Sequence, residues 1–252
     1  MIDSSTDQLE ISIGGLDFFI KQSPTVLNST RAGGTTGAAL WQSSVRVAVW
    51  ITQAQNPLFT QGLLDQTSIV MELGCGIAGV LPLVLSPRVR QYIATDQQYT
   101  LKLLNENLKS NESLSSPRSQ HGLRKQPSGK ISTFPFDWET DDARNLTTHQ
   151  GANTGVDLVI CCDCVYNFAL IAPLVQAMRD ICRIRQSSPV EEGTSMLPTV
   201  CMVAQQLRQS DVHEEWLRAF AQDFQILRIK DELLSEELKE GSGYAVYLGI
   251  LH

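Results

Sequence analysis

Carboxylates stand at the ends of four apolar runs of the sequence, a position from which acidic side chains can hold a polar ligand. These four acids are Glu72, Asp96, Asp137 and Asp163. In sheets of parallel strands, ligands bind at the carboxyl ends of the strands, so acids that end successive strands lie along one edge. We therefore expect the four carboxylates to share one site.

The first of these acids begins a glycine-rich turn, Glu72-Leu-Gly-Cys-Gly-Ile-Ala-Gly79. Gly74 and Gly76 let the backbone turn sharply and let a ligand approach without meeting a Cβ atom. The apolar run before the turn predicts a buried strand, and the run after it can begin a helix. Pro82 is tolerated there because the amides of a first helical turn have no partner within the helix. The pattern predicts a strand, a turn and a helix around a nucleotide.

Two classes of ligand compete for this turn. Its glycine spacing matches the dinucleotide fingerprint, and Asp96 follows at about the right distance for a ribose carboxylate, which favours NAD and an oxidoreductase. Glu72 favours S-adenosylmethionine instead, because a carboxylate repels a pyrophosphate and attracts a sulfonium and an ammonium group. From these residues alone both ligands stay open, as does a turn with a purely structural role.

Strands alternate with helices along the rest of the chain, which predicts an α/β fold with a doubly wound, mainly parallel, Rossmann-like sheet. The seven predicted strands span residues 69–72, 91–96, 131–136, 156–162, 199–204, 224–229 and 244–250. Two alternating segments around Gly14-Gly15 predict a β-hairpin before this sheet. We expect an N-terminal hairpin extension over residues 1–34 and a ligand-binding domain over residues 35–252. Within that domain, the Ser-, Pro- and Gly-rich segment 110–129 is predicted to be a mobile loop.

The composition suits one large α/β domain. The chain has 252 residues, of which 42% are hydrophobic, and this is enough for a full core. Its longest apolar runs are too short to span a membrane. The N-terminal residues lack the features of a signal peptide, so we expect a cytoplasmic protein, with the nucleus as the other option. A net charge of −7 offers no attraction for nucleic acid.

The six cysteines favour buried thiols over a metal site. Zinc sites take paired thiolates from two places in the chain. Cys161, Cys162 and Cys164 form one cluster, but neither the other cysteines nor the four histidines are spaced to complete it. We therefore expect no bound metal.

Taken together, these motifs resemble the seven-strand protein-lysine methyltransferases of the methyltransferase-16 group, in particular the fungal ribosomal lysine N-methyltransferases. The resemblance covers nearly the whole chain from Leu9 onward. It rests on Thr36-Gly-x-x-Leu-Trp41, Glu72-Leu-Gly-Cys-Gly76, Thr95-Asp96, Asp137-Trp138, Asp163-Cys-Val-Tyr166 and Gly243-Tyr-Ala-Val-Tyr247. The Asp163-to-Tyr166 element is its specific part, because the glycine turn also occurs in many unrelated methyltransferases.

The resemblance implies S-adenosylmethionine as the cofactor and a protein lysine, in a ribosomal or translation-associated protein, as the acceptor. Asp96 would bind the ribose hydroxyls and Trp138 would pack near the adenine, while Asp163 and Tyr166 would face the lysine. The other residues expected at the cofactor are Trp41, Glu72, Gly74, Cys75, Gly76, Asp137 and Cys162. We expect a monomer that binds neither nucleic acid nor membrane directly.

Three alternatives remain at this point. The chain could be an NAD-dependent oxidoreductase, or it could bind S-adenosylmethionine without catalysing a reaction. Asp163 could also serve only as the cap of a helix beginning near Phe168, since aspartate is a common N-cap residue.

Overall fold

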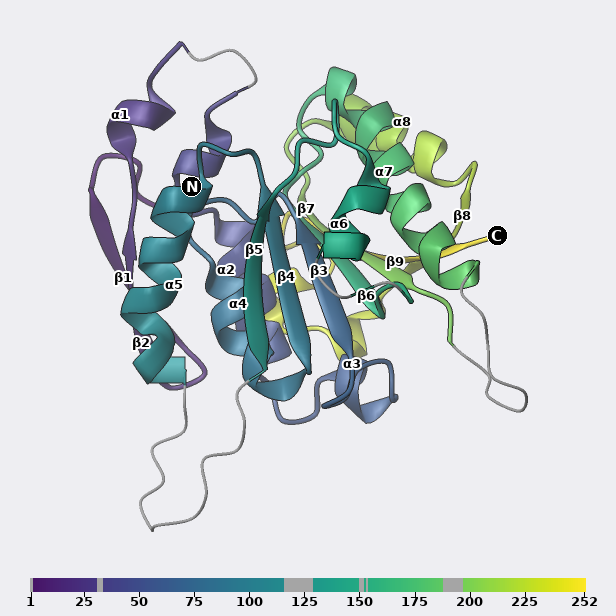
Figure 1. The fold of residues 1–252 in the computed structure, drawn as a ribbon, viewed down its shortest axis with the longest axis horizontal. Helices are drawn as coiled ribbons and strands as arrows, with labels where there is room; N and C mark the ends of the chain where they lie inside the picture. The colour runs from purple at the N-terminus through teal and green to yellow at the C-terminus, as the bar shows by residue number, and fades with distance from the viewer. Residues whose placement is uncertain (1, 31–33, 116–128, 150–151, 153, 188–196) are drawn as a thin grey trace.

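The computed structural model describes residues 2–30, 34–115, 129–149, 152, 154–187 and 197–252. Figure 1 shows a central twisted sheet with helices packed on both of its faces. The strands of this sheet are β3 (Ile69–Leu73), β4 (Gln91–Asp96), β5 (Lys130–Pro135), β6 (Leu158–Cys162), β7 (Val200–Gln206), β8 (Phe224–Arg228) and β9 (Tyr244–Leu251). Within the described residues it has seven strands in the order β5-β4-β3-β6-β7-β9-β8. Strands β3 to β7 are parallel and β9 is antiparallel to both of its neighbours, so the predicted doubly wound, mainly parallel sheet is confirmed.

Alternate residues of the buried strands face two separate hydrophobic clusters, as a pleated strand requires. In β3, Val70 packs into one cluster while Met71 packs into the other. The first cluster includes residues of α2 (Gln42–Ile51), α3 (Pro57–Thr60), α4 (Val80–Leu85) and α5 (Leu101–Ser115), and the second those of α6 (Ala143–His149), α7 (Phe168–Gln186) and α8 (Ser210–Phe220). All six cysteines are buried free thiols, as predicted. The sheet is therefore covered on both faces and leaves the strand ends for a ligand.

The predicted N-terminal hairpin is present. Strands β1 (Gln8–Ile13) and β2 (Leu16–Lys21) pair antiparallel as a separate two-stranded sheet, and α1 (Pro24–Leu27) follows. In Figure 1 the hairpin lies beside α5. Two asparagines of α5 hold the free edge of β2: Asn107 bonds the N–H and C=O groups of Lys21, and Asn111 bonds those of Phe19, each at 2.9 Å. These contacts fasten the hairpin to the larger sheet, and the domain boundary at residue 34 stays a prediction.

One local prediction was wrong, and one helix was not predicted. Residues 110–115 were expected to begin a mobile loop, but they continue α5 to Ser115, because the buried side chain of Asn111 fixes this turn against β2. The remainder of the predicted loop up to residue 128 lies outside the described residues. The short helix α6 was not expected, since Ala143 and Leu146 are too few apolar positions to reveal a helical period.

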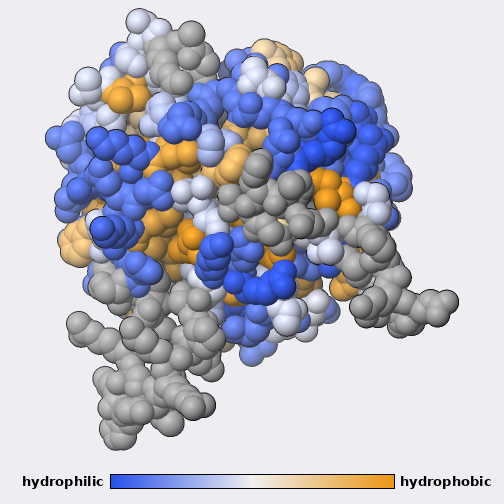
Figure 2. All heavy atoms as spheres, viewed as in Figure 1, coloured by the Kyte–Doolittle hydropathy of each residue, from blue (hydrophilic) through white to orange (hydrophobic). Residues whose placement is uncertain are grey.

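Hydrophilic residues cover much of the face shown in Figure 2, and apolar side chains gather toward its left centre. Strand β5, one of the two edge strands of the sheet, is only partly covered, and its hydrophobic residues Ile131 and Phe134 are partly buried. Among the helices that the structure describes, none combines the length and the apolar character needed to cross a bilayer.

Candidate active site

A cavity of about 530 Å³ lies at the carboxyl ends of β3, β4, β6 and β7. The chain runs outward from β3 through β4 to β5 and, on the other side, from β6 to β7, so the sheet order reverses between β3 and β6. Ligands of doubly wound sheets bind at such a point, and the volume suits a small organic ligand. Ten predicted site residues line the cavity: Trp41, Gly74, Cys75, Gly76, Asp96, Asp137, Trp138, Cys162, Asp163 and Tyr166.

The glycine turn needs its glycines for both conformation and space. Gly74 and Gly76 have positive φ angles of 71° and 63°, which other L-residues rarely adopt. A Cβ atom on Gly74 would lie 2.9 Å from the Cys164 sulfur, and one on Gly76 would lie 3.2 Å from the Gly37 carbonyl oxygen. Larger residues would therefore fill the floor of the cavity and strain the turn.

Asp96, at the end of β4, is bound to this turn. Its Oδ2 accepts a hydrogen bond of 2.7 Å from the Gly76 amide, and its Oδ1 accepts one of 2.7 Å from the Gln97 amide. Burial raises the pKa of Asp96 to about 6, and the two amide bonds oppose that shift. The carboxylate thus lies where the turn, the strand end and the cavity meet, and its contact with ribose hydroxyls stays a prediction.

Asp137 and Trp138 form the neighbouring wall after β5. Asp137 Oδ2 accepts a hydrogen bond of 3.0 Å from the Gln97 side chain, which connects the ends of β4 and β5. The Trp138 ring lies so close to Gly74 that a Cβ there would be 3.1 Å from it. This wall offers a flat aromatic surface beside the glycine turn, which suits a nucleoside base.

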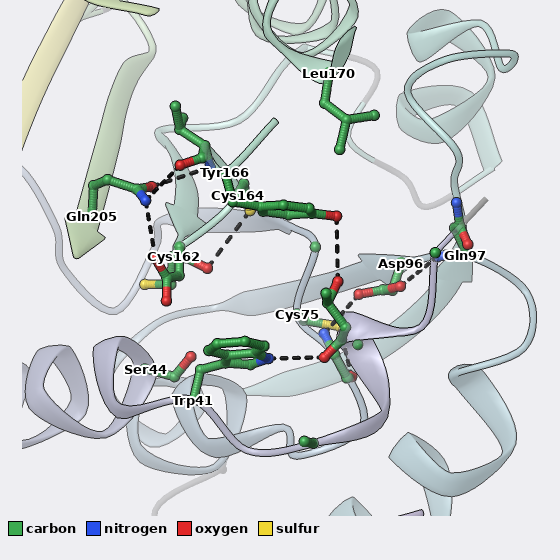
Figure 3. Close-up of a pocket in the computed structure, with 18 of the residues that line it drawn as sticks. Trp41, Ser44, Cys75, Asp96, Gln97, Cys162, Cys164, Tyr166, Leu170 and Gln205 are labelled. Carbon is green, nitrogen blue, oxygen red and sulfur yellow. Dashed lines mark hydrogen bonds between the residues drawn. The ribbon is translucent and has the colours of Figure 1, made fainter. Parts of the chain in front are cut away.

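The segment before α2 forms the opposite side of the cavity and connects two of the aromatic residues that line it. The Trp41 indole donates a 2.8 Å hydrogen bond to the Thr36 carbonyl oxygen, and the Thr36 hydroxyl donates a 3.3 Å bond to the Tyr166 hydroxyl. Figure 3 shows dashed lines from Trp41 and Tyr166 converging on this one neighbour. Burial raises the pKa of Tyr166, so its hydroxyl stays protonated at neutral pH.

Glu72 is the predicted site residue that does not line the cavity. Its side chain is buried under the turn, where Oε2 accepts a 2.8 Å hydrogen bond from the Tyr92 hydroxyl. Burial raises the pKa of Glu72 to about 8, so the carboxyl is mostly protonated at pH 7. A neutral buried group does not attract a sulfonium, and the electrostatic argument drawn from Glu72 is therefore weakened. A part for Glu72 in cofactor binding stays a prediction.

Asp163, directly after β6, has an unusual backbone and an incompletely paired side chain. Among the described residues it is the only non-glycine residue with a positive φ angle, 61°. Its Oδ1 accepts a 3.0 Å bond from the Gln205 side chain and forms a 2.5 Å ion pair with Arg208, whereas Oδ2 is buried without a partner among the described residues. The cap of α7 is Asn167, whose side chain accepts a bond from the Ala169 amide, so Asp163 does not cap that helix.

Sequence reasoning missed Gln205 and Arg208, which lie at the end of β7 and line the same cavity. Gln205 also bonds both backbone groups of Val165 and so fixes the loop after β6. Arg208 lies with its guanidinium carbon 5.0 Å from the centre of the Trp41 ring. The rule that ligands bind at strand ends could have included both residues, since the strand predicted over 199–204 ends just before them.

The charges of the cavity argue against a dinucleotide. Among the described residues that line it, the permanent cation is Arg208, which is paired with Asp163 at the end of β7 rather than with the glycine turn. Asp96 and Asp137 lie at that turn, where a pyrophosphate would bring two further negative charges. The site suits a nucleoside that carries a positive charge, and S-adenosylmethionine has this chemistry.

Fold and cavity together define a doubly wound α/β protein with a nucleoside-sized site at the switch point of its sheet. A family model described as lysine methyltransferase (Methyltransf_16) matches residues 21–191, which is more than half of the chain. The chain belongs to this family, and the predicted class of enzyme and its cofactor, S-adenosylmethionine, are confirmed.

Individual relatives agree with this assignment in part. Ribosomal lysine N-methyltransferase 5 of Zygosaccharomyces rouxii is 29% identical over 80% of this chain and 69% of its own length. The enzyme of the same name from Kluyveromyces lactis is 29% identical over 79% of this chain and 70% of its own length. A Schizosaccharomyces pombe protein named diaminohydroxyphosphoribosylamino-pyrimidine deaminase is 33% identical over 94% of this chain, but this chain spans only 50% of its length.

Proposed function

We propose that this chain transfers a methyl group from S-adenosylmethionine to a lysine side chain of a ribosomal or translation-associated protein. The family supports the reaction, and the names of the Zygosaccharomyces and Kluyveromyces relatives support the acceptor. We also propose that the enzyme acts as a cytoplasmic monomer, with the nucleus as the other location, and that it contacts the acceptor protein rather than nucleic acid.

In this proposal, the ends of β3, β4 and β5 hold the methyl donor. Asp96 accepts hydrogen bonds from the ribose hydroxyls, while it keeps the amide of Gly76 that shapes the turn. Trp138 packs against the adenine and Asp137 positions Gln97 beside it. The other predicted contacts come from Trp41, Gly74, Cys75, Gly76 and Cys162. When bound, S-adenosylmethionine supplies an electrophilic methyl group on its sulfonium.

The ends of β6 and β7 would hold the acceptor. A lysine must lose a proton to become a nucleophile, and its usual pKa of about 10.4 makes the neutral amine rare at pH 7. A partly buried aromatic channel formed by Trp41 and Tyr166 would disfavour the ammonium and lower that pKa. Asp163 orients the amine in line with the methyl group, and orientation is the main contribution that an enzyme can make to such a displacement.

The observation that carries the proposal is the buried Oδ2 of Asp163 in the wall of the cavity, which has no partner among the described residues. An unpaired buried acceptor is costly, on the order of 1–3 kcal/mol or more for a charged group. A donor that arrives with the substrate would remove this cost. An amine N–H fits the need, and a scaffold that only binds the donor would gain nothing from such an oxygen.

The test is transfer of tritiated methyl groups from S-adenosylmethionine to isolated yeast ribosomes, followed by mass spectrometry of the labelled protein. We expect label on one or a few lysines with the wild-type protein and much less with the Asp163→Asn variant. Label on another type of residue, or none on ribosomes and none on a whole-cell extract, would contradict the proposal. Calorimetry with NAD in place of S-adenosylmethionine tests the oxidoreductase alternative, and we expect no binding of NAD.

A further inference from the structure

One contact of the acceptor end is not used by the proposed mechanism. The guanidinium of Arg208 forms a 2.5 Å ion pair with Asp163 Oδ1 and lies over the Trp41 ring. The Asp163 side chain is 4% exposed and that of Arg208 is 35% exposed, so the pair is screened by solvent on one side only. The proposed lysine would therefore meet a carboxylate that already has a cationic partner.

The positive charge of this partner matters because it would lower the pKa of the lysine, and catalysis needs the neutral amine. A lone carboxylate stabilises an adjacent ammonium and raises its pKa, which would trap the lysine in its unreactive form. A guanidinium on the same carboxylate cancels much of that attraction and repels the ammonium. The neutral amine can still donate a hydrogen bond to the remaining oxygen, Oδ2.

Among the described residues around this pair, none carries a charge that could replace Arg208. Burial raises the pKa of Tyr166, Tyr244 and the Cys162 thiol and lowers that of His213, so all four are neutral at pH 7. Cys164 also lines the cavity. Arg46 lies over the Tyr244 ring, 4.1 Å from its centre, and its side chain reaches Glu237 rather than Asp163. Asp96 and Asp137 belong to the donor end, and Gln205 contributes a neutral bond to Asp163.

We propose that Arg208 is a positioning residue for the methyl transfer, which binds Asp163 Oδ1, leaves Oδ2 for the acceptor amine and favours the amine in its neutral form. The inference rests on the proposed function. Because Arg208 is fixed after β7 and Asp163 after β6, the two strand ends together set both the place and the protonation state of the acceptor.

The first experiment needs no protein acceptor. Sinefungin, in which a carbon bearing an amino group replaces the sulfonium and its methyl, places an ammonium where the acceptor end begins, whereas S-adenosylhomocysteine has no charge there. We expect the Arg208→Gln variant to bind sinefungin more tightly relative to S-adenosylhomocysteine than the wild type does, on the order of tenfold, because one repelling charge is lost. The Arg208→Lys variant keeps the charge, and its ratio should stay close to that of the wild type. An unchanged ratio in Arg208→Gln, or an equal change in both variants, would overturn the proposal.

The second experiment measures single-turnover methylation of isolated yeast ribosomes against pH at saturating donor. In Arg208→Gln the acidic limb of the rate profile should shift to higher pH by about one unit, since the lysine is harder to deprotonate. In Arg208→Lys the acidic limb should stay at the pH of the wild type. A uniform loss of rate at all pH values would indicate a structural role and overturn the inference. If wild-type protein labels no ribosomal lysine, the proposed acceptor is wrong, and the sinefungin comparison still decides the part played by Arg208.

Discussion

The two ends of the cavity are built from different groups. At the end formed by β3, β4 and β5, backbone amides and carboxylates satisfy one another, as between Gly76 and Asp96. At the end formed by β6 and β7, side chains dominate, and Asp163 keeps one buried oxygen without a partner among the described residues. Figure 3 shows Asp96 and Gln97 at one end and Cys162 and Gln205 at the other. Under the proposed function, this difference means that the donor site is formed in advance, whereas the acceptor site is completed by its substrate.

The largest effect is expected at the acceptor end. Asp163→Asn keeps the size of the side chain and tolerates the positive φ angle, since asparagine adopts this conformation more readily than most residues. Losing the charge-assisted contact with the reacting amine should cost about 2–4 kcal/mol of barrier, on the order of 30- to 1,000-fold in rate. Single-turnover kinetics at saturating donor measure this rate. A variant with wild-type turnover would leave Asp163 without a catalytic role.

A smaller and different effect is expected at the donor end. Asp96→Ala removes the acceptor of the ribose hydroxyls, a loss of about 1.5–3 kcal/mol for a charged hydrogen bond, or about 10- to 150-fold in affinity for S-adenosylmethionine. Because burial raises the pKa of Asp96 to about 6, wild-type affinity should also weaken as the pH falls through 6. The alanine variant should lack this step. Calorimetry from pH 5 to 8 measures both effects, and an unchanged dissociation constant would rule out the assignment.

How far the sequence predicts this contrast depends on the kind of signal. The strands and the donor end follow from apolar periodicity and from acids such as Asp96 that end a strand. Arg208 and Gln205 carry no periodic signal, and their role depends on β7 lying beside β6. The burial of Glu72 depends on Tyr92, its hydrogen-bond partner on the adjacent strand β4, and no local pattern reveals that pairing.

The two asparagines of α5 that bond the hairpin allow a finer comparison. Asn107 and Asn111 both bond β2, but only Asn107 also donates a 2.8 Å bond to the Ile77 carbonyl oxygen of the glycine turn. Replacing either by alanine should lower the free energy of unfolding by about 1–3 kcal/mol, because buried backbone groups lose their partners. Only Asn107→Ala should also weaken S-adenosylmethionine binding, by about 2- to 12-fold for one hydrogen bond. Equal affinities in the two variants would show that the bond from Asn107 to the glycine turn does not affect binding of S-adenosylmethionine, and would contradict this prediction.

The effect expected at Glu72 is a change in stability rather than in binding. The pKa of Glu72 is about 8 in the folded protein, against 4.5 for the carboxyl in the unfolded chain. The protonated carboxyl therefore stabilises the folded state fully below pH 4.5, and this stabilisation is lost as the pH rises toward 8. Glu72→Gln does not ionise, so its stability relative to the wild type should increase by about 3–4 kcal/mol between pH 5 and 8. Urea unfolding at both pH values measures this, and a constant difference would show that Glu72 is charged in the folded protein.

The central claim is that the two ends of the cavity work separately, one on the donor and one on the acceptor. The most direct test is the double variant Asp96→Ala with Asp163→Asn, measured for donor affinity and for single-turnover rate at saturating donor. We expect the double variant to have the dissociation constant of Asp96→Ala and the rate of Asp163→Asn, because independent sites combine additively. If Asp163→Asn alone weakens S-adenosylmethionine binding as much as Asp96→Ala does, the two ends form one donor site and the account is contradicted.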